Sequence, residues 1–229
     1  QHKIGADIIM AFDECTSDTA EEKYVKEAMN RTHAWAERCI VEHKKNTSYH
    51  GYRQFLFGII QGANNKALRE ESAKIISSMN FDGIAIGGES IGYNMQATKQ
   101  ILDWINPIIP EDKPHYTMGV GFSPIDLFEV VERGVDMFDC VITTRHARHG
   151  EIFVFKNRKI VRKNFYEIIS IVKSKHKNDF KPLDKICDFI RRREGLSIEP
   201  GAAGIGIELN GTLFGERHID RVAIEIEQI

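Results

Sequence analysis

A repeated alternation of short apolar strands with amphipathic helices constrains this 229-residue chain more than any other feature of its sequence. Five apolar runs are nearly continuous, which is typical of parallel strands that are buried on both faces. Regular alternation of such strands with helices indicates a parallel α/β sheet. The expected strands are Asp7–Phe12, Phe55–Gln61, Gly83–Gly88, Tyr116–Gly121 and Met137–Thr143.

The expected helices carry recognisable start and stop signals. Ser17 or Asp18 is expected to cap the first helix. Ser123 and Pro124 supply an N-cap and a first-turn proline for the fourth helix, and Gly134 follows its end. The expected helices are Ala20–Lys45, Asn65–Met79, Asn94–Ile105 and Ser123–Arg133.

Five strand–helix units are fewer than the eight that close a (β/α)₈ barrel. We therefore expect either an open sheet or a barrel that is completed by sequence not shown here or by another chain. The first residues, Gln1–Ile4, read as the end of a helix, so the chain is expected to open within a unit.

The pattern changes after Thr143. The segment Glu151–Lys163 predicts a hairpin with strands at Ile152–Phe155 and Ile160–Arg162, whereas Tyr166–His176 predicts a helix. The remaining residues do not continue the strand–helix alternation, which indicates a separate appendage at the C-terminal end.

The composition narrows the functional classes. With 42% hydrophobic and 28% charged residues, the chain is typical of soluble globular proteins. Its net charge of −2 means that a nucleic acid would have to be held by a local basic patch. No apolar run approaches the roughly 20 residues of a membrane span. The four cysteines form no Cys-x-x-Cys pair, which disfavours a disulfide framework and an ordinary zinc site and predicts a cytoplasmic setting.

The C-terminal ends of the first three expected strands carry polar residues or glycines. A parallel α/β barrel places its active site at these strand ends. Asp13 could accept hydrogen bonds from a ligand, or it could be a helix cap or form a salt bridge in a loop. Gln61 carries an amide that could read the edge of a base, or it could be a turn residue. Gly87 and Gly88 leave room for a ligand against the backbone.

Asp139 is a carboxylate within a run that otherwise reads as strand core. Burial of an unpaired carboxylate costs several kcal/mol, so such a residue is usually paired or functional. A carboxylate can attack a sugar C1′ to form a covalent intermediate. The structural alternative is a buried ion pair with Arg145 or Arg148, which lie in a basic turn just beyond the strand. That turn could instead contact RNA or be a solvated loop.

Taken in order, these strand ends resemble the motifs of the tRNA-guanine transglycosylase family. The resemblance implies a TIM (β/α)₈-type barrel, incomplete here with about five βα units over residues 1–183, followed by a divergent C-terminal segment at residues 184–229. The segments that carry the resemblance are Asp7–Cys15, Phe57–Gly62, Phe81–Gly88, Tyr116–Gly121, Gly134–Val141 and Thr144–Gly150.

The resemblance implies exchange of a guanine in the tRNA anticodon loop for a 7-deazaguanine base of the preQ1 or queuine type, through a covalent Asp–ribose intermediate. It implies no redox or nucleotide cofactor, and we expect a homo- or hetero-oligomer. The implied roles are nucleophile for Asp139, base binding for Asp13, Gln61, Gly88 and Met118, and RNA binding for Arg145 and Arg148.

The sequence also departs from the family pattern. The motif that carries the family's general-base aspartate is not among these residues. Of the expected zinc ligands only Cys187 matches, because Phe189 and Arg192 stand where further cysteines are expected, so we predict no metal. Glu89 and Tyr93 replace a usual leucine and glutamate after the glycine pair. A non-catalytic tRNA-binding partner subunit or an inactive fragment is therefore the alternative prediction.

Overall fold

The computed structural model describes residues 1–46, 50–155 and 166–170. The chain forms two compact units, Gln1–Cys140 and Val141–Ile229, which we describe separately. The elements of the first unit are β1 (Ile8–Met10), α1 (Glu22–Lys45), β2 (Phe55–Ile60), α2 (Lys66–Ser78), β3 (Gly83–Ile86), α3 (Met95–Ile105), β4 (His115–Thr117), α4 (Pro124–Val131) and β5 (Met137–Phe138).

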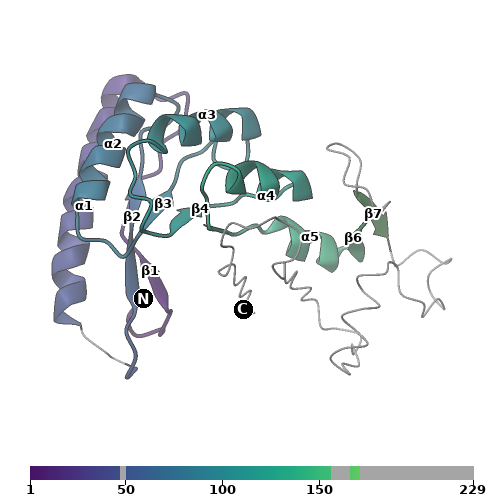
Figure 1. Ribbon diagram of the computed structural model, residues 1–229, viewed down its shortest axis with the longest axis horizontal. Helices are drawn as coiled ribbons and strands as arrows, with labels where there is room; N and C mark the ends of the chain where they lie inside the picture. The colour runs from purple at the N-terminus through teal and green to yellow at the C-terminus, as the bar shows by residue number, and fades with distance from the viewer. Residues whose placement is uncertain (47–49, 156–165, 171–229) are drawn as a thin grey trace. The chain divides into compact units, whose positions relative to one another are not determined.

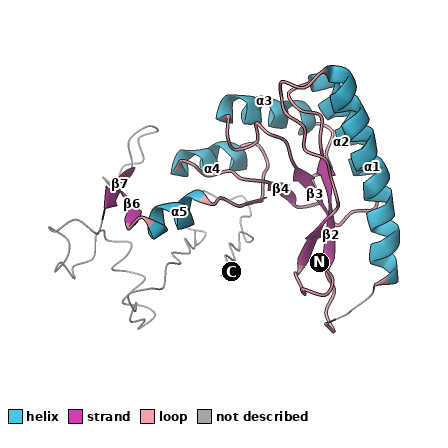
Figure 2. Ribbon diagram, turned by 180° about the vertical axis from the view of Figure 1, so that it is seen from behind, coloured by secondary structure: helices cyan, strands magenta, loops and turns pink. Residues whose placement is uncertain are grey.

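The first unit is a curled half-barrel of five parallel strands. The strands pair in sequence order, β1-β2-β3-β4-β5, and a helix joins each strand to the next. Helices α1 to α4 lie on the same side of the curved sheet (Figures 1 and 2). This arrangement confirms the predicted α/β class and the incomplete TIM-type barrel.

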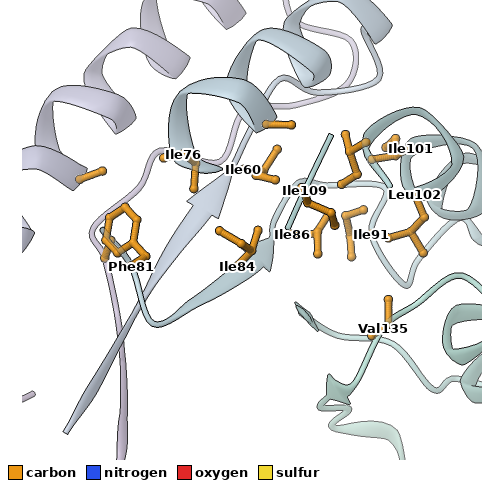
Figure 3. Packing of buried hydrophobic residues seen from close by; sticks show 14 of the residues in the cluster. Ile60, Ile76, Phe81, Ile84, Ile86, Ile91, Ile101, Leu102, Ile109 and Val135 are labelled. Carbon is orange, nitrogen blue, oxygen red and sulfur yellow. The ribbon is translucent and has the colours of Figure 1, made fainter. Parts of the chain in front are cut away.

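Most of the hydrophobic core lies between the sheet and these helices. Alternation along β3 sends Ile84 and Ile86 towards the helices, where both are fully buried. They pack with residues from α2 and α3, including Ile76 and Ile101, as Figure 3 shows. The same alternation turns Ala85 to the opposite face of the sheet, which is the inner face of the half-barrel.

The inner face leads to the predicted site. Along β2, Gly58 packs against Phe81 and Ile76 on the helix side, so Phe57 and Gln61 point inwards. The pairing of Ala85 with Tyr116 and of Tyr116 with Met137 carries this inner face across the sheet. Side chains beyond the C-terminal ends of the strands therefore converge on one edge.

Three of the expected helices begin with a side-chain cap, of which only the Ser123 cap was predicted. Asn65 and Asn94 accept hydrogen bonds from backbone N–H groups in the first turns of α2 and α3. Ser123 forms a capping box with Asp126 at the start of α4.

The predicted cap of α1 is wrong. Helix α1 begins after Glu21, which makes no side-chain capping bond. Ser17 and Asp18 instead contact Glu89 and Ser90, so a tertiary contact takes the polar groups that a local cap would have used. Residues 1–5, expected to end a helix, form a turn in which the Gly5 N–H donates to the Gln1 carbonyl at 3.3 Å and Gly5 has a φ of +85°.

The last two predicted strands are shorter than expected. Strand β4 ends at Thr117, and the chain turns at Gly119, whose φ is +72°. Strand β5 pairs only with β4, so its pairing ends at Phe138. Ile142 and Thr143, predicted to be in this strand, belong to a helix. An edge strand cannot extend beyond the partner that supplies its hydrogen bonds.

The described part of the second unit contains helix α5 (Ile142–Arg148) and the antiparallel pair β6 (Glu151–Phe155) and β7 (Tyr166–Ser170). A hairpin was predicted here, but the expected partner strand Ile160–Arg162 lies outside the described residues. The predicted helix at Tyr166 is wrong, because its first five residues pair with β6; aromatic and β-branched residues favour a strand there. Within the described ranges, no helix is long and apolar enough to cross a membrane.

Candidate functional site

Asp13 and Gln61, predicted separately from two strand ends, form a direct hydrogen bond. The Gln61 Nε2 donates to Asp13 Oδ2 at 2.6 Å. Gln61 is only 2% exposed, and its backbone N–H donates to Ser72 Oγ at 3.2 Å. Its Oε1 is buried and has no partner among the described residues. The pair therefore presents a carboxylate and a free amide oxygen, both of which accept hydrogen bonds.

The glycine pair beside them is required by the protein's own side chains. A Cβ on Gly87 would lie 2.6 Å from Gln61 Nε2. A Cβ on Gly88 would collide with Arg69 Nη2, and the φ of Gly88 is +134°, a conformation that favours glycine. The sequence predicted that a ligand would occupy the space beside these glycines. In the structure, part of that space holds Gln61 and Arg69.

Arg69 is a buried part of the site that the sequence interpretation missed. Its side chain, from α2, is fully buried and donates from Nε to Ala63 O at 2.6 Å and from Nη1 to Gly87 O at 2.6 Å. A longer bond of 3.2 Å reaches Ile60 O. Burial lowers the pKa of the guanidinium to about 10, so it stays protonated at neutral pH.

A sequence signal for Arg69 was present. It occupies the buried stripe of α2 together with Ser72 and Ile76, at the three- and four-residue spacings of one helix face. A cation on such a stripe must find buried acceptors, and here it finds the carbonyls of two strand-end turns.

Glu89 links the turn after β3 to the loop after β1. Its Oε2 accepts from Ser17 Oγ at 2.9 Å and from the Asp18 N–H at 2.7 Å. Both bonds lower the pKa of Glu89; the bond from the Asp18 N–H has the larger effect and the bond from the Ser17 hydroxyl the smaller one. Ser90 Oγ donates to Asp18 Oδ2 in the same contact. Glu89 and Ser90 thus fasten the turn after β3 to the loop after β1.

Asp139 lies just after β5 and is exposed, which corrects the prediction of a buried carboxylate. Tyr116 Oη donates to its Oδ1 at 2.5 Å, and the Gly119 N–H donates to the same oxygen at 3.1 Å. Burial, reinforced by the Asp139 hydrogen bond, raises the pKa of Tyr116, so its hydroxyl remains a donor. Among the described residues, Oδ2 has no hydrogen-bond partner.

The remaining predicted residues fall in two places. Met118 is half-buried and follows β4, on the inner-face side by its alternation with Tyr116. Arg145 and Arg148 lie in the second unit, on α5, and both are exposed. The basic turn predicted there is thus a short helix.

Metal-binding residues are not clustered in the described ranges, where no group of three His, Cys, Asp or Glu side chains could hold an ion. Cys187 lies outside those ranges. The donor set around it does not fit a zinc site of the expected type, because phenylalanine and arginine side chains do not ligate zinc.

A parallel α/β half-barrel with carboxylates and amides at its strand ends has the architecture of a barrel enzyme's active-site edge. The family model for queuine tRNA-ribosyltransferase matches residues 1–190. The chain therefore belongs to the queuine tRNA-ribosyltransferase family, which is the tRNA-guanine transglycosylase family predicted from its motifs.

Individual relatives agree with this assignment. A queuine tRNA-ribosyltransferase of Shouchella clausii is 44% identical over 82% of this chain and 46% of its own length. Those of Staphylococcus haemolyticus and Bacillus subtilis are 46% and 43% identical, again over 82% of this chain and 45% of their own length. The chain thus spans about half the length of the curated relatives it matches.

Proposed function

We propose that this chain carries the base-reading and nucleophilic part of a tRNA-guanine transglycosylase site, which replaces an anticodon guanine with a 7-deazaguanine base of the preQ1 or queuine type. The observation that carries the proposal is the hydrogen bond from Gln61 to Asp13 at the same sheet edge as Asp139. Its support is the family membership and the names of the relatives.

The Asp13–Gln61 pair suits a guanine-type base. Such a base presents N–H donors on its amide and exocyclic amine, and the Asp13 carboxylate accepts both kinds. The unpartnered Gln61 Oε1 gives a further acceptor in a water-excluded position. Gly88 and Met118 complete the proposed pocket, with Met118 against the face of the base. Burial makes each of these hydrogen bonds more selective, because a base lacking the donor would leave an acceptor unsatisfied.

Asp139 is the proposed nucleophile. Its Oδ2 attacks C1′ of the target ribose, a C1′–O bond forms, the C1′–N9 bond breaks, and guanine leaves with its bonding electrons and takes up a proton. The incoming base then attacks C1′ through its corresponding nitrogen, loses the proton there and releases Asp139. Tyr116 and Gly119 hold Oδ1, which orients the carboxylate towards the sugar.

The exchange needs no redox or nucleotide cofactor in this proposal, because each half-reaction only replaces one bond to C1′ by another. We propose that zinc is absent, since Cys187 has no matching thiols at positions 189 and 192. The proton transfers require a general base, which we propose comes from polypeptide outside these 229 residues, through a homo- or hetero-oligomer or a covalently continuous chain.

The tRNA is the proposed macromolecular partner. Its target base must leave the stack to reach a pocket, and unpaired RNA loops offer such bases. Arg145 and Arg148 are exposed cations that can contact anticodon nucleotides. A cytoplasmic setting follows from a tRNA substrate.

A covalent trap tests the function. The chain, alone and with the N-terminal half of a family member added, is incubated with guanine-containing anticodon stem-loop RNA and 9-deazaguanine, and intact mass is measured. We expect a protein–RNA adduct that Asp139→Asn abolishes. An Asp112→Asn variant is the control, because that carboxylate is exposed in the turn before β4, at the opposite end of the strand from the site.

The alternative of a non-catalytic partner subunit gives a different result. RNA binding that is insensitive to Asp139→Asn and to free 7-deazaguanine, with no adduct in either mixture, would replace the proposed reaction by tRNA binding alone. Release of the RNA adduct on addition of a 7-deazaguanine would instead complete the proposed exchange.

A further inference from the structure

Two exposed aromatic rings meet at the sheet edge that carries the proposed site. Tyr93, after β3, is 82% exposed, and Phe122, after β4, is 41% exposed. Their ring centroids are 5.6 Å apart and the rings are inclined by 78°. Two rings at this angle form a corner that can stack a flat ring on one face and contact its edge with the other.

Each ring occupies the position just before a helix N-cap. Tyr93 precedes Asn94 of α3, and Phe122 precedes Ser123 of α4. An apolar residue at this position often packs against the fourth residue of its helix. For Tyr93 that residue is Thr98, a buried threonine whose hydroxyl bonds to backbone groups. At 82% exposure, the Tyr93 ring is therefore not used to fasten its own helix.

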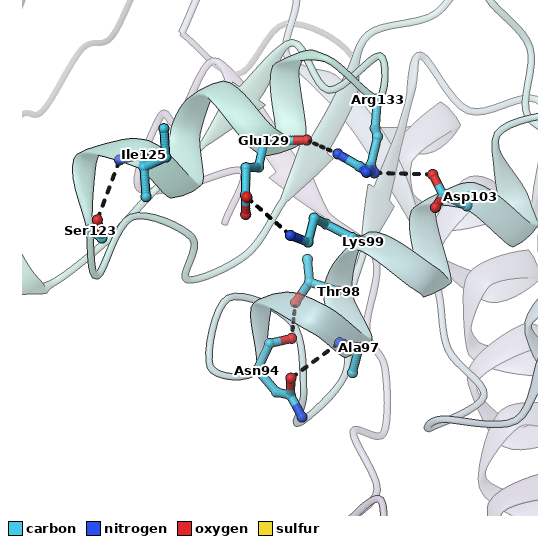
Figure 4. Close-up of polar contacts among 9 residues, drawn as sticks. All are labelled: Asn94, Ala97, Thr98, Lys99, Asp103, Ser123, Ile125, Glu129 and Arg133. Atoms are coloured by element: carbon cyan, nitrogen blue, oxygen red, sulfur yellow. Dashed lines mark hydrogen bonds and ion pairs between the residues drawn. The ribbon is translucent and has the colours of Figure 1, made fainter. Parts of the chain in front are cut away.

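Two ion pairs link the segments that follow the two rings. Lys99 of α3 lies 3.0 Å from Glu129 of α4, and Arg133 lies 3.0 Å from Asp103 (Figure 4). Each pair is partly exposed and contributes modestly, but together they restrict the relative movement of α3 and α4. The helices that follow the two rings are thus linked to each other.

The corner adjoins the proposed nucleophile. Gly92, next to Tyr93, packs so closely on the Gly119 backbone that a Cβ there would collide with the Gly119 carbonyl. Gly119 in turn donates its N–H to Asp139. On the other side, a Cβ on Gly121, which precedes Phe122, would lie 3.3 Å from Cys140 Cβ.

We propose that Tyr93 and Phe122 form a stacking platform for the nucleotide adjacent to the guanine that is exchanged. The inference rests on the proposed function. If Asp139 attacks a ribose of the RNA, the nucleotides on either side of that ribose lie one phosphodiester away and come close to the corner. Those bases are unpaired in an anticodon loop and stack readily on aromatic side chains. Stacking would hold the RNA backbone while the target base enters the pocket.

The test uses anticodon stem-loop RNAs with 2-aminopurine placed either directly before or directly after the target guanine. Binding to the chain is expected to change the fluorescence of one of them. The Tyr93→Leu/Phe122→Leu double variant keeps apolar side chains but loses the rings, and should weaken RNA binding by about tenfold or more. Tyr93→Trp should bind RNA as tightly as the unchanged chain.

Phe55→Leu is the matched control, because Phe55 is also 41% exposed but begins β2, at the opposite edge of the sheet. It should leave RNA affinity unchanged. The affinity of the double leucine variant for free 7-deazaguanine should also be unchanged, since Asp13 and Gln61 are untouched. A general structural defect would lower both affinities together and would count against the platform.

The outcomes separate this inference from the proposed function. If the unchanged chain forms the Asp139-dependent adduct and the leucine variant binds RNA equally well, the platform is overturned and the function stands. The platform is also overturned if RNA binding changes the fluorescence of neither 2-aminopurine. That result is expected if a protein segment, and not RNA, covers the two rings. If the unchanged chain neither binds RNA nor forms the adduct, both proposals fail.

Discussion

The two halves of the candidate site are built differently. Where β1, β2 and β3 end, Gln61 and Arg69 are buried; Gln61 donates to the Asp13 carboxylate and Arg69 donates to the Gly87 carbonyl. Where β4 and β5 end, Asp139 is exposed and is held by one hydroxyl and one backbone N–H. The first half is part of the packed interior, whereas the second is carried by a two-residue edge strand.

The difference matches what each half is proposed to contact. A small planar base is read best by preorganised groups in a dry pocket, where an unsatisfied partner is costly. A nucleophile that attacks a ribose within RNA must be reached by a large substrate, which favours exposure. Site residues in this fold are thus not uniformly buried, and Asp139 is the residue for which burial was wrongly predicted.

The largest expected difference between the two halves is in how much a buried aromatic ring contributes to stability. Phe57→Ala should lower the free energy of unfolding by about 3–5 kcal/mol, because this β2 ring is almost fully buried. Phe138→Ala on β5 should cost about half as much, since the ring is only partly buried. Urea unfolding followed by the fluorescence of Trp35 and Trp104, both in the first unit, measures each. Equal losses would contradict the contrast between the halves.

A smaller effect is expected on base binding. Gly87→Ala adds a methyl group 2.6 Å from Gln61 Nε2 and should displace that amide from Asp13. Affinity for 7-deazaguanine, measured by calorimetry, should fall about tenfold, or about 1.4 kcal/mol. The same substitution in a Gln61→Ala background should have no further effect. A full additional loss in that background would show that Gly87 acts independently of Gln61.

Alkaline pH probes the nucleophile half. Tyr116 has its pKa raised above the ordinary value of 10, so its contribution to stability is complete below pH 10 and is lost as pH rises further. The stability of the unchanged chain should therefore fall more steeply above pH 10 than that of Tyr116→Phe, which cannot ionise. Parallel pH profiles of the urea midpoint would contradict the burial of the Tyr116 hydroxyl together with its hydrogen bond to Asp139.

The smallest effect is expected at a surface contact near the base-reading half. Hydrogen bonds lower the pKa of Glu14 to about 2; the bond from Arg31 has the largest effect and the bond from Tyr24 the next largest. Its contribution is present above its ordinary pKa of 4.5 and is lost as pH falls towards about 2. Thermal melts should show a shallower acid decline for Glu14→Gln than for the unchanged chain. Identical declines would mean that the three side chains do not interact in solution.

Much of the fold could be predicted because its signals are local. Nearly continuous apolar runs located the five strands, and Asn94 and Ser123 cap the helices that they were expected to begin. The family motifs predicted Asp13 and Gln61 as one binding site, and the structure joins them. The cap of α1 failed because Ser17 and Asp18 contact residues more than seventy positions away.

The sequence by itself determined the α/β class, the order of the units and the family, since these depend on residue types at short and regular spacings. Only the tertiary structure decided that Arg69 bonds to the carbonyls of two turns, that Asp139 is exposed and that Tyr93 meets Phe122. The physical reason is that a parallel sheet brings the ends of successive strands to one edge, so contacts there join residues separated by an entire helix.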